Sequence, residues 1–108
     1  MKMQQHNLLF TPPEHVHFLA QKLYGNAVIS DCSIAYLEQD GGGPMQNHTH
    51  AHDHLFIVTD GEAEIKLADK SVILRKNESY LVKGMIPHSV WNHAEQTTVM
   101  IGISIMPA

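Results

Sequence analysis

Short runs of β-favouring residues, separated by turn-forming residues, occupy most of the chain from residue 26 onward. β-branched and aromatic side chains are frequent in residues 26–39 and 97–106, and residues 62–67 alternate between charged and apolar side chains. That alternation is the period of a strand with one buried face. No stretch of the sequence carries a sustained helical pattern with caps. The sequence therefore predicts an all-β sandwich or small barrel.

Turn-forming residues divide this pattern into elements. Residues 54–67 are predicted to form a β-hairpin with Asp60 and Gly61 at its turn, because this pair suits a tight turn with positive φ. Residues 41–44 (GGGP) are expected to interrupt regular structure, since glycine and proline disfavour strand and helix. Further turns are expected near residues 68–70 and at residues 76–77.

Composition limits the classes of partner. The chain has 108 residues, of which 44% are hydrophobic and 17% charged, so it can bury the core of one globular domain. The formal net charge is −4 and Arg75 is the only arginine, which argues against nucleic acid and acidic membrane as partners. Cys32 is alone, so we expect no internal disulfide, a reducing compartment and a small buried side chain at this position. With no signal peptide or long apolar run, the predicted location is the cytoplasm.

Residues 48–54 (HTHAHDH) place a histidine at every second position. On one strand these side chains would share a face, at a spacing of about 6.6 Å along the chain. Two neighbouring imidazoles can reach one metal ion, whereas a third ligand four residues further on requires a bend. His88 could complete the site from another strand. The alternative is a flexible His-rich loop that binds metal adventitiously, with His88 as an ordinary core or turn residue.

The first of two separated stretches resembles the first motif of the cupin family. That motif runs Gly, five residues, His-x-His, three or four residues, Glu, six residues, Gly. Residues 42–61 follow it in order through Gly42, His48, His50, His54 and Gly61. The departure is His54, which stands where the family usually has Glu.

The second stretch, residues 77–92, resembles the second cupin motif, which ends in Gly, a short gap, His, three residues and Asn. Here Gly84, His88 and Asn92 occupy these places, with a gap between Gly84 and His88 one residue longer than usual. The two motifs cover about half of the chain and agree in order and spacing. Asn92 is expected to be structural, bonding its own loop.

The resemblance implies a small double-stranded β-helix, the jelly-roll barrel of cupins, as a single domain over residues 1–108. It also implies one divalent transition-metal ion (Fe, Ni, Cu, Zn or Mn) bound by His48, His50, His54 and His88. Four neutral imidazoles argue mildly against a strict preference for manganese. They also leave the full +2 charge on the ion, which favours an anionic co-ligand.

His52 competes with His54 for the ligand role, because it fits the strand spacing equally well. The family spacing favours His54. His52 then lies beside the ion, where it could act as a general base, since an imidazole exchanges protons near neutral pH.

The function expected from the resemblance is a metalloenzyme acting on a small organic substrate that is anionic or oxygenated. Candidate reactions are those of a dioxygenase, isomerase, cyclase or decarboxylase. The alternatives are a non-enzymatic module that binds a small ligand or sugar, and a metal-binding protein without an organic ligand. Small cupins commonly form homodimers through edge strands, and residues 26–39 and 97–106 are the candidate edge segments.

Overall fold

The computed structural model describes residues 9–107, and of Asn47, His48 and Pro107 it describes the backbone alone. The described residues form strands and no helix. The strands are β1 (Leu9–Phe10), β2 (Ala20–Gln21), β3 (Ala27–Leu37), β4 (Gly42–His48), β5 (Asp53–Asp60), β6 (Ala63–Leu67), β7 (Ser71–Leu74), β8 (Ser79–Val82), β9 (His88–Asn92) and β10 (Thr98–Pro107). The all-β prediction is confirmed.

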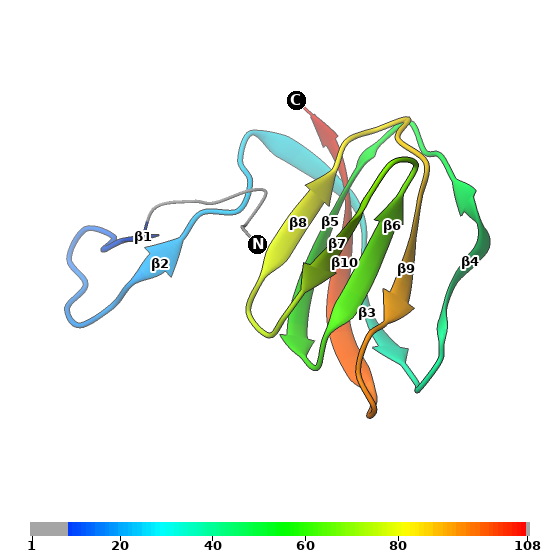
Figure 1. Ribbon diagram of the computed structural model, residues 1–108. Helices are drawn as coiled ribbons and strands as arrows, with labels where there is room; N and C mark the ends of the chain where they lie inside the picture. Colours follow the sequence, from blue (N-terminus) through cyan, green and yellow to red (C-terminus); the bar gives the residue numbers. More distant parts are fainter. Residues whose placement is uncertain (1–8, 108) are drawn as a thin grey trace.

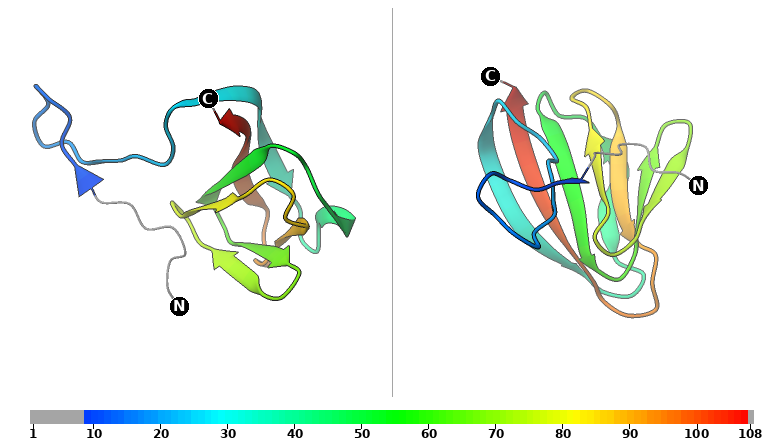
Figure 2. Two further views of the ribbon diagram at one scale, coloured as in Figure 1. Left: turned by 90° about the horizontal axis from the view of Figure 1, so that it is seen from above. Right: turned by 90° about the vertical axis from the view of Figure 1, so that its left-hand side faces the viewer.

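Two four-stranded antiparallel sheets make up the barrel. One has the strand order β3-β10-β5-β8 and the other has the order β4-β9-β6-β7. Figure 1 shows the two sheets facing each other, with strands far apart in sequence, such as β3 and β10, lying side by side. The small pair β1-β2 stands to one side of the barrel in Figure 1 and in the left-hand view of Figure 2. This arrangement is the predicted jelly-roll barrel.

The core lies between the two sheets. Val58 and Ile65 are 0% exposed, and Leu74 and Val82 are 2% exposed, so strands of both sheets contribute. In β6 the predicted alternation is confirmed, because Ala63 and Ile65 are buried whereas Lys66 is exposed. Apolar side chains at every second position therefore fix which face of each strand turns inward.

The predicted hairpin over residues 54–67 is wrong. β5 pairs with β10 and β8, whereas β6 pairs with β9 and β7, so the two strands lie in opposite sheets. Asp60 and Gly61 form the corner between the sheets. Gly61 has a φ of 86°, as predicted, and a Cβ there would collide with Thr98. A turn signal of this kind predicts that the chain reverses, but not that the flanking strands pair. The hairpin is β6-β7, whose turn lies near residues 68–70 as predicted.

The expectation that residues 41–44 interrupt regular structure is also wrong, because β4 begins at Gly42. β4 is an edge strand, in which Gly42 pairs with Trp91 and Gly43 pairs with Val90. The register then shifts before His48, and Pro44 lies in this irregular part. A residue without an N–H is tolerated there, since edge strands and bulges leave ladder positions unpaired.

The outer face of the first sheet carries exposed apolar side chains. β3 is an edge strand, as expected for residues 26–39, and its Ile29, Ile34 and Tyr36 are 61%, 58% and 67% exposed. Residues 97–106 are not an edge segment, however, because β10 lies between β3 and β5. Cys32 is exposed on β3 rather than buried, since this strand is uncovered over most of its length.

Candidate metal centre

The four histidines of residues 48–54 do not share one strand. β4 ends at His48, residues 49–52 form a loop, and β5 begins at Asp53. The backbone of His48 pairs with His88 of β9, whereas its side chain lies outside the described atoms. The loop supplies the bend that sequence spacing required for a third ligand.

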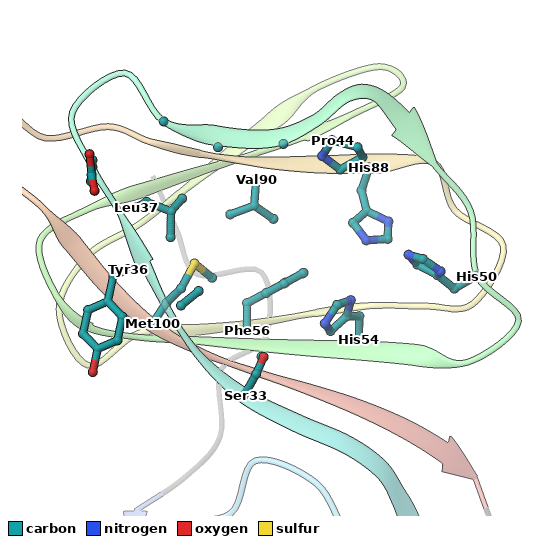
Figure 3. A pocket seen from close by; sticks show the side chains of 16 residues that line it. Ser33, Tyr36, Leu37, Pro44, His50, His54, Phe56, His88, Val90 and Met100 are labelled. Atoms are coloured by element: carbon teal, nitrogen blue, oxygen red, sulfur yellow. The ribbon is translucent and has the colours of Figure 1, made fainter.

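Three histidines converge on one point. His50 from the loop, His54 from β5 and His88 from β9 each offer a ring nitrogen, and these atoms all lie within 4.8 Å of one another. Figure 3 shows the three imidazoles gathered at one end of a cavity. Nitrogens bound to one ion at about 2.0–2.1 Å are separated by up to about 4 Å, so small side-chain adjustments would suffice. The three side chains are placed to hold a metal ion.

His88 is already oriented as a ligand. Its side chain is only 5% exposed, and Nδ1 lies 2.9 Å from the carbonyl oxygen of Ile86. A carbonyl only accepts hydrogen bonds, so Nδ1 must carry the proton and donate it. Nε2 is therefore the nitrogen with a free lone pair. A hydrogen bond of this kind fixes both the tautomer and the ring orientation of a metal-binding histidine.

His54 has a nitrogen that needs a partner. Its Nδ1 is buried, and no hydrogen-bonding group in the described part of the chain reaches it. Burial, followed by the neighbouring histidines His88, His50 and His52, lowers the pKa of His54 from 6.5 to about 4. The imidazole is therefore neutral at physiological pH. A buried, neutral nitrogen without a partner fits a metal ion, which would supply the missing bond.

A glycine makes room for this ring. Gly102 of β10 faces His54, and a Cβ at this position would lie 3.3 Å from Nε2 of His54. That spacing is tighter than ordinary van der Waals contact. A larger side chain at Gly102 would therefore press on the imidazole, so the glycine leaves room for the ring in this position.

Asp53 holds the histidine loop in place. Its side chain is 7% exposed, and its carboxylate accepts hydrogen bonds from the N–H of Gly84 at 2.8 Å and the hydroxyl of Tyr24 at 2.9 Å. Beside this bond, the N–H of Met85 donates to the carbonyl oxygen of His50 at 2.6 Å. Burial alone would raise the pKa of Asp53. The hydrogen bonds from Gly84 and Tyr24 and the charge of Lys83 outweigh it, so the pKa is lowered below its ordinary value. The sequence analysis missed Asp53, whose only signal was its place between two histidines.

His52 lies beside the three converging histidines. Its ring stacks on that of His50, with centroids 4.9 Å apart, and its centroid is 5.9 Å from that of His54. It does not belong to the group whose nitrogens lie within 4.8 Å. The stacking contact instead restricts the orientation of the His50 ring.

Asn92 is structural, as predicted. Its side-chain amide donates to the carbonyl oxygens of Leu37, Glu38 and Gln96, at 2.8, 3.0 and 2.9 Å, and accepts from the N–H of Ala94 and the hydroxyl of Thr98. These bonds join the end of β9 to the turn before β4 and to the start of β10. Asn92 therefore stabilises the end of the barrel opposite the histidines, rather than the metal centre itself.

Comparison with known protein families decides the family. The profile described as "Cupin domain" matches residues 35–105, which is well over half of the chain. The chain belongs to the cupin family. None of the proteins with curated functions matches this cupin.

Solved structures agree on the fold. A protein of unknown function from Streptococcus pyogenes superposes with a TM-score of 0.63 at 17% identity, covering 71% of this chain and 64% of its own. A cupin-like protein from Thermotoga maritima gives 0.62 at 23% identity, covering 68% of this cupin and 54% of that chain. A predicted oxalate decarboxylase from Thermotoga maritima gives 0.66 at 14%, covering 72% and 67%. The match thus spans between half and two thirds of the first two proteins, and at these identities it shows the fold alone.

The histidines of this cupin form one end of a cavity of about 600 Å³ between the two sheets. Figure 3 shows Phe56, Val90 and Met100 between the histidines and the opposite end, near Leu37. This volume is in the range of small-molecule sites. Within residues 9–107, this cupin has no helix long and apolar enough to cross a membrane.

Proposed function

We propose that this cupin is a metalloenzyme that binds one divalent transition-metal ion through His50, His54 and His88 and acts on a small organic substrate. His48 is the proposed fourth ligand, because its backbone pairs with that of His88. The observation that carries the proposal is the convergence of three ligand nitrogens within 4.8 Å at the wall of a cavity. The domain is proposed to be one barrel, with its metal-binding residues in the stretches 42–61 and 77–92.

The donor set suits iron, nickel, copper or zinc better than manganese, because imidazole is its only described ligand type. A bound ion would keep its full +2 charge and act as a Lewis acid toward a substrate oxygen. The chain itself supplies preorganisation. The bond from His88 to Ile86 fixes the His88 ring, and burial keeps the His54 ring neutral, so that both can offer a lone pair to an ion.

His52 is proposed to position His50 rather than to bind the ion, with proton transfer to or from substrate as its further role. The support is the stacked contact between the two rings. His52→Ala should then lower turnover while leaving metal stoichiometry at one per chain. Loss of the metal would instead assign His52 to the ligand set.

The proposed reactions are those of a dioxygenase, isomerase, cyclase or decarboxylase, in which a bound ion would polarise a substrate oxygen or bind molecular oxygen. Metal analysis of untagged protein, followed by titration of the metal-free protein with Co²⁺ and Zn²⁺, tests the centre. His88→Ala should weaken binding at least tenfold, because it removes a buried ligand already held in position. His93→Ala, an exposed histidine one residue beyond β9, is the control and should bind as wild type does.

Equal metal affinity in His88→Ala and wild type would contradict the proposal and favour a flexible His-rich loop. A protein that binds metal and ligand but returns every ligand unchanged would be a sensing module. That outcome separates the enzyme from the non-enzymatic alternative.

We also propose that the protein works as a homodimer in the cytoplasm. Support for the dimer comes from the exposed apolar side chains of β3, Ile29 and Ile34 among them, which line the edge of the first sheet. Exposed apolar surface on an edge strand is a common site of association between copies. Support for the location is the single cysteine, Cys32, which suits a reducing compartment.

A further inference from the structure

The cavity beside the metal centre has two chemically distinct parts. One end carries the ring nitrogens of His50, His54 and His88. The walls beyond them are apolar, with Phe56, Val90 and Met100 between the histidines and Leu37, as Figure 3 shows. A molecule that fills this space would meet metal at one end and hydrocarbon along its length.

The charge of the cavity lining also limits which substrates fit. Among the described residues that line it, none is a lysine or arginine, and Glu38 is the charged one. A substrate with a second anionic group would therefore find no cation besides the ion, and would meet the negative charge of Glu38. Placing an unpaired charge against apolar walls is costly. Sugar phosphates and short dicarboxylates fit this distribution poorly.

The open side of the cavity runs along β3. Ser33 and Ala35 line the cavity but are exposed to solvent, because β3 is an edge strand. Their side chains lie on the inward face, since Ala35 pairs with Met100 of the core, whereas Ile34 pairs with Ile101 on the outer face. Substrate can therefore enter beside β3 and lie along the apolar walls toward the histidines.

We infer that the substrate is a molecule with a single metal-binding oxygen group, such as a carboxylate or enolisable carbonyl, on an apolar aliphatic or aromatic body. This inference rests on the proposed metal centre for the head group. The preference for an apolar body comes from the cavity walls alone, so the two can fail separately.

A series of straight-chain carboxylates tests the inference on Co²⁺-loaded protein. Affinity, measured by calorimetry and by the cobalt absorption spectrum, should rise by up to about fourfold per methylene from acetate to hexanoate, since each methylene that is fully removed from water adds about 0.8 kcal/mol. Adipate has the length of hexanoate but carries a second carboxylate. It should bind at least tenfold more weakly.

The same series is then measured on metal-free protein, with displacement of an apolar fluorescent dye as the assay. This experiment separates the contribution of the metal-binding head group from that of the apolar body. The gain per methylene should persist while every affinity falls. A flat series in both forms, or adipate binding as tightly as hexanoate, would overturn the inferred substrate class. If affinity rose with chain length but was no higher with Co²⁺ than without it, the inferred apolar body would be supported and the proposed metal centre would be contradicted.

Ala35→Phe provides a steric test. A larger side chain on the inward face of β3 should weaken hexanoate binding at least tenfold and leave acetate binding within a factor of two. Ser71→Phe, at an exposed position on β7, the edge strand of the other sheet, is the matched control and should change neither. Equal effects of the two substitutions would show that the ligand does not lie along this wall, and would also overturn the inference.

Discussion

Asp53→Ala should weaken the metal centre although Asp53 is not a proposed ligand. The carboxylate joins the histidine loop to the segment between β8 and β9, through the N–H of Gly84 at 2.8 Å. It also joins the loop to Tyr24, which lies before β3. His50 is attached to the same segment by a backbone bond from Met85. Asp53→Ala would therefore remove two of the bonds that hold the loop against its neighbours.

The magnitude follows from the groups left without partners. A half-buried N–H such as that of Gly84 costs about 1–2 kcal/mol when its acceptor is removed. The hydroxyl of Tyr24 can turn to water, and the ion pair with Lys83, at 3.8 Å and with a side chain 65% exposed, adds little. We therefore expect Asp53→Ala to lower the free energy of unfolding by about 2 kcal/mol. Metal affinity should fall about 10–100-fold, as for other residues that orient metal ligands.

Urea unfolding and Co²⁺ titration of the same preparations measure both effects. Asp60→Ala is the control, because Asp60 is an exposed aspartate at the other end of β5. It should change stability by no more than about 0.5 kcal/mol and leave cobalt affinity unchanged. If Asp53→Ala bound cobalt as tightly as wild type, the loop would be held by other contacts and the reasoning would be refuted.

Three further predictions concern pH, the barrel end and association. The folded pKa of His54 is about 4 against an ordinary value of 6.5, so the unfolded chain takes up this proton first as pH falls. The metal-free protein should lose about 1–2 kcal/mol of stability between pH 6.5 and 4, after allowance for partial exposure, and urea unfolding of His54→Gln should show a smaller loss. Asn92→Ala should lower stability by about 2–4 kcal/mol, since it breaks several hydrogen bonds, but should leave zinc affinity within a few-fold at a temperature where the variant is folded. Ile34→Glu should shift sedimentation from dimer to monomer, because it places a charge on the exposed apolar edge of the first sheet; an unchanged dimer would place the contact elsewhere.

The sequence predicted where the strands lie better than it predicted which strands pair. Alternation in residues 62–67 located β6 and its inward face, because burial of every second side chain is a local property. Pairing is not local. Asp60 and Gly61 gave the same turn signal that a hairpin would give, but the chain crosses there from one sheet to the other. Similarly, the β-branched run at residues 97–106 could not show that β10 lies between β3 and β5.

The burial and the hydrogen-bond partners of charged and polar residues were still harder to predict from the sequence. Asp53 is buried because a donor 31 residues away, Gly84, meets its carboxylate. Nothing in the local sequence distinguishes this aspartate from an exposed one. Asn92 was predicted to be structural from its place in the motif, but its partners at Leu37 and Glu38 are more than 50 residues away. Hydrogen bonds of this range exist only once the sheets are assembled.

The spacing of the histidines shows why a regular pattern did not mean a regular strand. On a continuous strand, residues 50 and 54 would lie about 13 Å apart along the chain, too far for both to bind one ion. The structure instead ends β4 at His48 and begins β5 at Asp53, so that the loop brings His50 back over His54. His88 approaches from the opposite sheet, because β9 pairs with β4 at His48. The metal centre therefore depends on the break between the strands, which Asp53 and the segment after β8 hold in place.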